Sequence, residues 1–293
     1  MIQKTLLAAI AALSLGGADM AAANQLANQV FGNVPGPTAG TPAVIGGASR
    51  GCVSGAVALP ETGPTWQAMR LSRNRNWAHP DTVNFLMGLS QAATQAGWRG
   101  LYIGDLSQPR GGPMTSGHAS HQSGLDADIW MLPPSSLTLS RQQRENISSV
   151  SVVNQAGTGL SGNWNAGHAA IIRAAAQDPR VDRIFLDPVI KVEMCRMHGN
   201  QGDWLQKLRP LNGHDYHMHV RLRCPQGDRT CEPQTPGVAA LSGNDNGCAE
   251  AAQWVQNRIT PPPAPPPDPN YRHPRSFTMA EMPQQCQVVG TAR

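Results

Sequence analysis

Apolar residues recur at helical spacing in two stretches of the chain. The first, Val83–Ala96, predicts a helix that starts at Pro80 with Asp81 as its cap and ends at Gly97. The second surrounds Ala166–Ala176. The chain is therefore expected to contain two or three helices.

Four shorter segments are typical of strands: Leu101–Ile103, Leu125–Leu132, Arg183–Leu186 and Tyr216–Leu222. In the second segment, apolar residues alternate with Asp126 and Asp128. In the last, they alternate with His217, His219 and Arg221. Because side chains two apart on a strand share a face, both segments predict strands with one apolar and one polar side.

The segments between these elements are rich in glycine and proline. Residues 24–50 are predicted to be an irregular lead-in, and Gln108–Gly117 to be a loop. Residues 261–269 carry seven prolines in nine positions and predict an extended polyproline segment rather than a core element. Short strands and a few helices in this order favour the α+β class, in one domain over residues 24–293.

The composition excludes several classes of protein. Apolar residues make up 40% and charged residues 14% of the 293 positions, so the chain can build a core. The 23 basic and 19 acidic residues give a net charge of +4 and are interspersed, unlike the basic patches of nucleic-acid-binding proteins. We therefore expect a loop-rich globular protein with no nucleic-acid partner.

The first 23 residues have the features of a secretory signal peptide. Lys4 supplies a positive charge, Leu6–Leu15 is a short apolar run, and Ala21 and Ala23 fit a cleavage site. A transmembrane anchor needs about 20 apolar residues, and Asp19 interrupts the run too early. We expect export, cleavage near Ala23 and no integral membrane span.

An even number of cysteines favours three disulfides in an exported protein: Cys52, Cys195, Cys224, Cys231, Cys248 and Cys286. Many pairings are open, and the spacing alone suggests only a local bridge between Cys224 and Cys231. The alternative is that these two bind zinc as thiolates. It is weaker, because the sequence has no Cys-x-x-Cys spacing and no histidine at finger distance.

Five of the nine histidines fall in two short windows: His118 and His121 in the first, and His214, His217 and His219 in the second. If the two polar-faced strands are neighbours, His121, Asp128 and one histidine of the His-x-His pair can converge. Imidazole and carboxylate are ligands that zinc takes, and three protein ligands plus water characterise a catalytic site. The alternative is hydrogen-bonded histidines without a metal, but two such windows in one exported chain favour zinc.

Zinc lowers the pKa of a coordinated water to about 7 and polarises carbonyl groups. A base must still take up a proton and pass it to a leaving amine. The sequence has no His-Glu-x-x-His motif, so the candidate base is His217 if His219 is a ligand, while His214 would stabilise an oxyanion or hold His217. With no Gly-x-Ser-x-Gly motif for a serine nucleophile, the residues predict a zinc hydrolase of amide bonds.

The arrangement of His121, Asp128 and His217-x-His219 resembles the metal signature shared by lysostaphin-type peptidases, D-alanyl-D-alanine metallopeptidases and the hedgehog amino-terminal domain. Three longer strings resemble penicillin-insensitive murein endopeptidases: GHASHQSGLDADIW (117–130), AAAQDPRVDRIF (174–185) and HMHVRLRCP (217–225). The likeness covers nearly the whole chain after the signal. It implies a periplasmic zinc metallopeptidase that cuts D-alanyl to meso-diaminopimelyl cross-links of peptidoglycan, on a small antiparallel sheet with flanking helices and long disulfide-held loops.

The resemblance also implies roles for single residues. By position, His121, Asp128 and His219 are the expected zinc ligands, His118 is a weaker ligand, and the catalytic residues are His217 as base and His214. The implied disulfides are Cys52–Cys286, Cys195–Cys248 and Cys224–Cys231. Family members can carry a further acid and histidine after the first window, associated with a second metal. Residues 145–160 offer Glu145 but no histidine, so the sequence does not support a second zinc.

Two other functions and one further residue are open at this point. A D-alanyl-D-alanine carboxypeptidase would use the same metal site to trim a chain end. A non-catalytic zinc-containing module that binds the cell wall would need no base, so His217 and His214 argue against it. Arg221 either holds a substrate carboxylate, pairs with Asp126 or Asp215, or lies at a solvated strand end. The oligomeric state is open.

Overall fold

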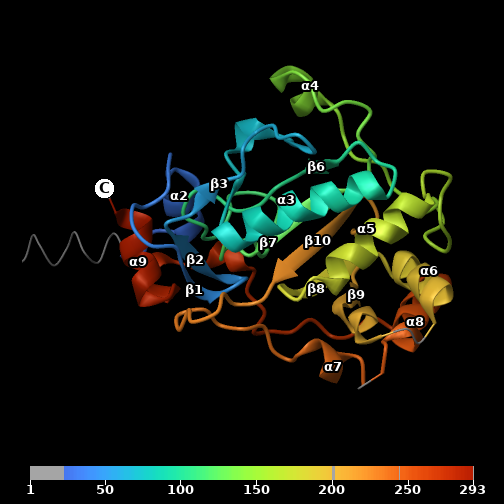
Figure 1. Ribbon diagram of the computed structural model, residues 1–293. Helices are drawn as coiled ribbons and strands as arrows, with labels where there is room; N and C mark the ends of the chain where they lie inside the picture. Colours follow the sequence, from blue (N-terminus) through green and yellow to red (C-terminus); the bar gives the residue numbers. More distant parts are fainter. Residues whose placement is uncertain (1–22, 200–201, 244, 293) are drawn as a thin grey trace, which may run out of the picture.

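A six-stranded sheet forms the centre of the computed structural model, which describes residues 23–199, 202–243 and 245–292 (Figure 1). Its strands, in spatial order, are β4 (Trp66–Ala68), β6 (Leu101–Ile103), β7 (Asp126–Trp130), β10 (His217–Leu222), β8 (Val181–Leu186) and β9 (Leu208–Pro210). The central pairs β6–β7, β7–β10 and β10–β8 are antiparallel, whereas the edge pairs β4–β6 and β8–β9 are parallel. The α+β class is confirmed, and the predicted polar-faced strands are the neighbours β7 and β10.

Helices α3 (Pro80–Gln95) and α5 (Ala166–Gln177) cover one face of this sheet (Figure 1). Their apolar sides share a buried core with the apolar faces of β7 and β10, among them Ala127, Ile129, Met218 and Val220. Each fully buried aliphatic side chain stabilises such a core by about 1.5–3 kcal/mol. Because one face is held by this packing, the polar residues of β7 and β10 face the other way.

The remaining helices and strands surround the sheet. They are the α-helices α2 (Ala27–Gly32), α4 (Arg141–Asn146), α6 (Pro188–His198), α7 (Val238–Leu241), α8 (Cys248–Ile259) and α9 (Gln284–Thr291), the 3-10 helices η1 (Leu71–Arg73), η2 (Asp203–Lys207), η3 (Pro274–Ser276) and η4 (Met279–Glu281), and the strands β1 (Ala43–Gly47), β2 (Arg50–Ser54), β3 (Val57–Ala58) and β5 (Trp77–Ala78). Residues 24–50, predicted to be irregular, therefore contain regular elements. The predicted loop at residues 108–117 has no helix or strand.

The start of α3 differs from the prediction in its capping residue. His79, rather than Asp81, has the extended backbone of an N-cap, and its Nδ1 accepts a hydrogen bond from the Asp81 amide at 3.2 Å. Pro80 occupies the first helical position, where its missing amide hydrogen costs nothing and its fixed φ suits a helix. Asp81 instead lies in the first turn, where its negative charge favours the helix dipole.

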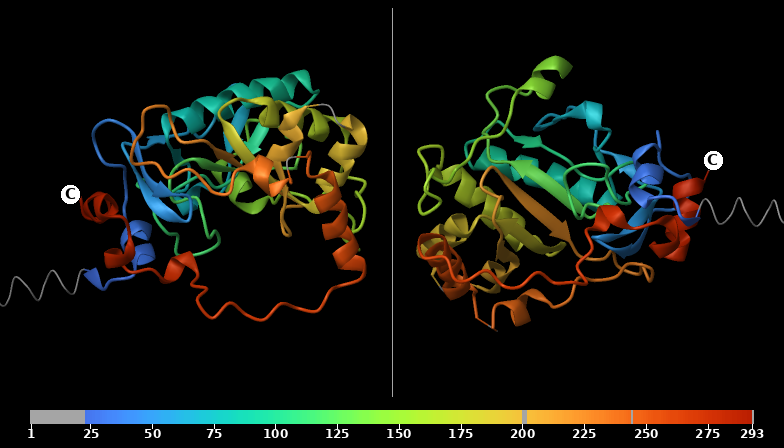
Figure 2. Two further views of the ribbon diagram at one scale, coloured as in Figure 1. Left: turned by 90° about the horizontal axis from the view of Figure 1, so that it is seen from below. Right: turned by 180° about the vertical axis from the view of Figure 1, so that it is seen from behind.

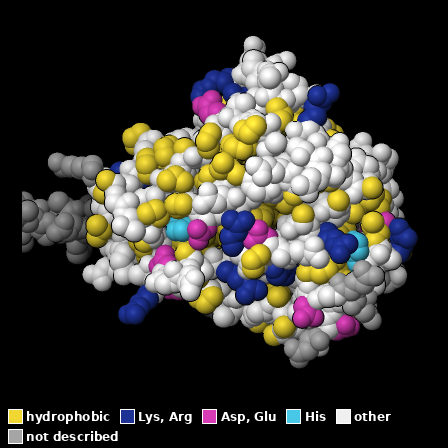
Figure 3. Space-filling model, viewed as in Figure 1, with side chains coloured by type: hydrophobic (Ala, Val, Ile, Leu, Met, Phe, Trp, Pro, Cys, Tyr) yellow, Lys and Arg dark blue, Asp and Glu magenta, His cyan; other side chains and the backbone are white. Residues whose placement is uncertain are grey.

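Three disulfides, Cys52–Cys286, Cys195–Cys248 and Cys224–Cys231, connect the elements as the family resemblance implied. The first fastens α9 to β2, beyond the proline segment 261–269, which runs as an extended and exposed stretch after α8 (Figure 2). In the described part of the chain no helix is long and apolar enough to cross a membrane. The predicted signal peptide lies almost entirely outside the described residues. Basic and acidic side chains are interspersed on the face shown in Figure 3, as the sequence suggested.

Removing the long-range disulfide is expected to destabilise the protein more than removing the local one. Cys52 and Cys286 are 234 residues apart and Cys224 and Cys231 are 7 apart, so loop closure alone predicts losses of about 5 and about 2 kcal/mol. The double serine variants of each pair, compared by urea unfolding, measure the difference. An equal loss in both variants would contradict this explanation.

Candidate metal centre

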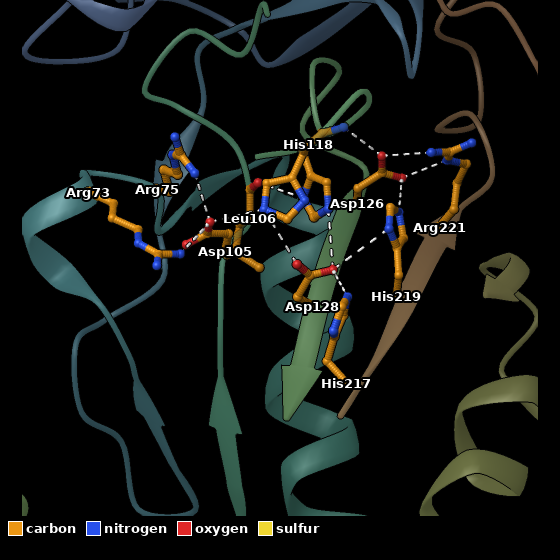
Figure 4. Close-up of polar contacts among 11 residues, drawn as sticks. Arg73, Arg75, Asp105, Leu106, His118, Asp126, Asp128, His217, His219 and Arg221 are labelled. Atoms are coloured by element: carbon orange, nitrogen blue, oxygen red, sulfur yellow. Dashed lines mark hydrogen bonds and ion pairs between the residues drawn. The ribbon is translucent and has the colours of Figure 1, made fainter. Parts of the chain in front are cut away.

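The pairing of β7 with β10 places the acidic residues of one strand opposite histidines and arginine of the other. His219 is the cross-strand partner of Asp128, and Arg221 is the partner of Asp126. All four side chains are buried. The alternation of both strands directs them to the face of the sheet that α3 and α5 do not cover, where Figure 4 shows them pointing toward one another.

His121 reaches this face from the loop before β7. Its backbone has φ +64°, a conformation that is uncommon for a residue other than glycine. Three contacts hold it there. Its amide donates to Asp126 Oδ2 at 2.8 Å, and its Nδ1 donates to the Leu106 carbonyl at 2.7 Å. The third is the 3.3 Å approach of its Nε2 to Asp128 Oδ1. Because a carbonyl only accepts, Nδ1 carries the proton, and Nε2 is the atom free to bind a metal.

The predicted ligands His121, Asp128 and His219 contact one another pairwise. Asp128 Oδ1 lies 3.3 Å from His121 Nε2 and 3.7 Å from His219 Nδ1, and the two imidazole rings are 4.5 Å apart at their centres. Within the described residues, two overlapping groups have their ligand atoms within 4.8 Å: His118 with His121 and Asp128, and His121 with Asp126 and His219. The weaker predicted ligand His118 is thus part of the cluster, and Asp126 joins it although the sequence analysis did not propose it as a ligand.

The donor atoms of this cluster fit a metal ion. Among the buried side-chain atoms with no hydrogen-bond partner in the described chain are His121 Nε2, Asp128 Oδ1, His217 Nδ1 and His219 Nε2. Buried polar atoms without a partner are costly, and so many in one place call for a ligand. Imidazole nitrogens with one carboxylate are the donor set of catalytic zinc sites.

The electrostatics of the cluster keep two of its proposed ligands, His219 and Asp128, in the forms that bind a metal. Burial lowers the pKa of His219 to about 4, so its ring is neutral near pH 7. Burial would raise the pKa of Asp128, but the neighbouring His121 and His217 outweigh it and hold this pKa well below its usual value. Burial would likewise lower the pKa of His121, yet the Asp128 carboxylate raises it. A metal at this site would therefore compete with a proton on His121.

Both carboxylate oxygens of Asp126 accept hydrogen bonds from residues of the protein. Arg221 Nε donates to its Oδ1 at 2.6 Å and Arg221 NH2 to its Oδ2 at 2.9 Å, in addition to the His121 amide. His219 Nε2 lies 3.4 Å from Asp126 Oδ1. Asp126 thus holds the His121 loop and lies close to His219 without forming a hydrogen bond to its Nε2. Of the alternatives for Arg221, the structure shows the ion pair with Asp126.

A third carboxylate at the site, Asp105, was not anticipated from the sequence. It lies two residues after the end of β6, and its Oδ2 lies 3.0 Å from His118 Nε2, 3.0 Å from Arg73 Nη1 and 2.9 Å from Arg75 Nη1 (Figure 4). Burial opposes its charge, but the hydrogen bond to His118 and the nearby Arg73 and Arg75 lower its pKa to about 2. The only sequence signal was an acid at the end of a buried strand. Its partners lie more than ten residues away in the chain.

The two predicted catalytic histidines border the cluster. His217 is 7% exposed, and its Nε2 lies 3.6 Å from Asp128 Oδ1. Burial lowers the pKa of His217, so its ring is neutral and can accept a proton near pH 7. The His214 ring lies 4.9 Å from the His217 ring, and its Nδ1 donates to the Asn212 carbonyl at 3.2 Å. His217, His118 and Asp128 line a cavity of about 430 Å³ that is open to solvent.

Comparison with known proteins adds independent information. The model of the family described as penicillin-insensitive murein endopeptidase matches residues 44–290. A penicillin-insensitive murein endopeptidase of Haemophilus influenzae is 39% identical over 242 residues, covering 77% of this chain and 79% of the relative. One of Klebsiella pneumoniae is 36% identical over 271 residues, covering 92% and 94%.

Proposed function

Because the chain belongs to the family of penicillin-insensitive murein endopeptidases, we propose that it uses Zn²⁺ to hydrolyse the D-alanyl to meso-diaminopimelyl amide of peptidoglycan. That the protein is a murein endopeptidase, and so a metallopeptidase, follows from the family. The observation that supports the zinc proposal is the group of buried ligand atoms without partners beside the neutral His217.

His121, Asp128 and His219 are the proposed ligands, and His118 is a weaker one. His118 has a strong competing contact, since its Nε2 is 3.0 Å from Asp105 and 3.6 Å from Asp128. When bound, zinc polarises the substrate carbonyl and makes water acidic enough to attack at neutral pH. Two residues keep the ligands in place: the Leu106 carbonyl fixes the protonation of His121, and Asp126 holds its backbone.

His217 is the proposed base. It accepts a proton from the attacking water and delivers it to the amide nitrogen, which leaves as an amine. His214 is a positioning residue in this proposal. Its Nδ1 proton is directed to Asn212, so in its neutral form it has no proton left at Nε2 to donate to an oxyanion. Its ring packs against His217 instead.

The location of the protein follows from its substrate. Three disulfides and action on peptidoglycan indicate an exported protein. We propose the periplasm as its compartment, after removal of the signal peptide near Ala23, and residues 24–293 as one domain. Peptidoglycan cross-links are the proposed partner, and the described residues include no helix that could span a membrane.

Chelation tests the proposed function directly. The mature protein with Zn²⁺ is expected to convert cross-linked muropeptide dimers into monomers, a chelator is expected to abolish this, and added Zn²⁺ to restore it. The masses of the products report which bond breaks, and a β-lactam should have no effect because no serine acyl-enzyme forms. Dimers that remain intact with zinc present would disprove the proposal.

A further inference from the structure

The cavity beside the metal centre has a wall of arginines. Arg70, Arg73 and Arg75, at and around η1, line it together with Tyr216 and His217 of the β10 side of the site. Arg73 connects to the cluster through two side chains. Its NH1 is 3.0 Å from Asp105, Asp105 is 3.0 Å from His118, and His118 is 3.6 Å from Asp128. Because successive contacts share an atom, the Arg73 guanidinium lies close to Asp128, at the wall of the same cavity.

The three arginines differ in whether a carboxylate already balances their charge. Arg75 is 9% exposed and bound to Asp105 and to Ser116. Arg73 is 47% exposed and shares the same Asp105 oxygen, so one carboxylate serves two guanidinium groups. Arg70 donates to the Ser148 hydroxyl at 2.9 Å and forms no ion pair with any described residue. The wall therefore has more positive charge than its own carboxylate balances.

The η1 turn is held in a conformation that its sequence does not favour. The residues on either side of it, Arg70 and Asn74, both have positive φ, +56° and +51°. Asparagine adopts this region readily, but an arginine there is uncommon and persists where contacts hold it, which is often at functional sites. Glu145 supplies such contacts, since it accepts from the Ser72 amide at 2.8 Å and from its hydroxyl at 2.9 Å. Glu145 thus stabilises η1 and the arginines around it.

We propose that Arg73, with Arg70 beside it, binds the carboxylate on the substrate carbon next to the scissile amide nitrogen. The inference rests on the proposed function, because the meso-diaminopimelyl residue carries such a carboxylate. Arg73 is exposed to the cavity and has donors left, and guanidinium groups bind carboxylates in a bidentate manner. Arg221 was the arginine considered from the sequence for binding a substrate carboxylate, but Asp126 neutralises its charge.

The test uses two synthetic cross-linked peptides that differ only in this carboxylate, which is free in one and an amide in the other. The wild-type protein with Zn²⁺ is expected to cleave the free acid about 10- to 100-fold more efficiently in kcat/KM. Arg73→Gln should lose this factor on the free acid through KM, because the contact exists before and during the reaction. It should leave cleavage of the amide unchanged. Arg73→Lys should recover part of the loss, since it retains the charge without the bidentate geometry.

The controls distinguish failure of the inference about Arg73 from failure of the proposed function. Arg196→Gln removes an exposed arginine that is paired with Glu193 on α6, outside the cavity, and should change neither substrate. Equal losses on both substrates in Arg73→Gln would mean that Arg73 acts only through Asp105 and would overturn the inference, as would no loss on either. If Arg73→Gln does not fold, Arg70→Gln is read in the same way, with a smaller expected loss. A wild-type protein that cleaves neither peptide would disprove the proposed function itself.

Discussion

Asp128→Ala is expected to contain no stoichiometric metal after purification and to release no monomers from muropeptide dimers. Asp128 Oδ1 lies between His121, His217 and His219, so its removal takes away the one carboxylate that all three histidines face. The remaining imidazoles then surround a site with no negative ligand of its own. Metal content by atomic spectroscopy and product masses are the two measurements.

The controls for this variant separate metal loss from unfolding. Asp128→Asn preserves the shape of the side chain and should also lose most of its metal, since it removes the charge. Asp268→Ala removes an exposed acid of the proline segment and should retain both metal and activity. Asp128→Ala protein that is folded by circular dichroism and still contains one metal per chain would show that this aspartate is not a ligand.

His217→Ala is expected to separate binding of the metal from catalysis. The variant should retain its metal, because His121, Asp128 and His219 are left in place, but cleave about 10²- to 10⁴-fold more slowly, as expected for loss of a general base. The loss should be in kcat, since the proton transfer belongs to the reaction rather than to substrate binding. His198→Ala, a histidine on α6 that packs against Trp204, is the matched control. Full activity in His217→Ala would rule out the base assignment.

Local patterns predicted the elements that carry the site. The alternation of apolar residues with Asp126 and Asp128, and with His217 and His219, predicted two strands with polar faces, and both are present as β7 and β10. Alternation works here because one face of each strand must be apolar to pack against α3 and α5. Helix α2, within residues 24–50, was missed because its packing partners η3 and α9 lie far along the chain.

The site was only partly predictable for the same reason. The sequence named the histidines of the cluster from their spacing. It contained no sign that Asp105 lies beside His118, or that η1 lies at the rim of the cavity, because these contacts connect three separate segments. It also left three partners open for Arg221, and the register of β7 with β10 decided between them by placing Arg221 opposite Asp126.

The sequence by itself determined which groups are available for chemistry: the histidines and aspartates of the proposed metal centre, the proposed histidine base, an even set of cysteines and the likeness to murein endopeptidases. Only the tertiary structure decided how charge is distributed around that chemistry. Whether an arginine is neutralised or free depends on which carboxylates the fold brings within reach, and electrostatic interaction depends on distance in space rather than along the chain. That is why Arg221 has Asp126 to itself, whereas Arg73 shares Asp105 with Arg75 and faces the cavity.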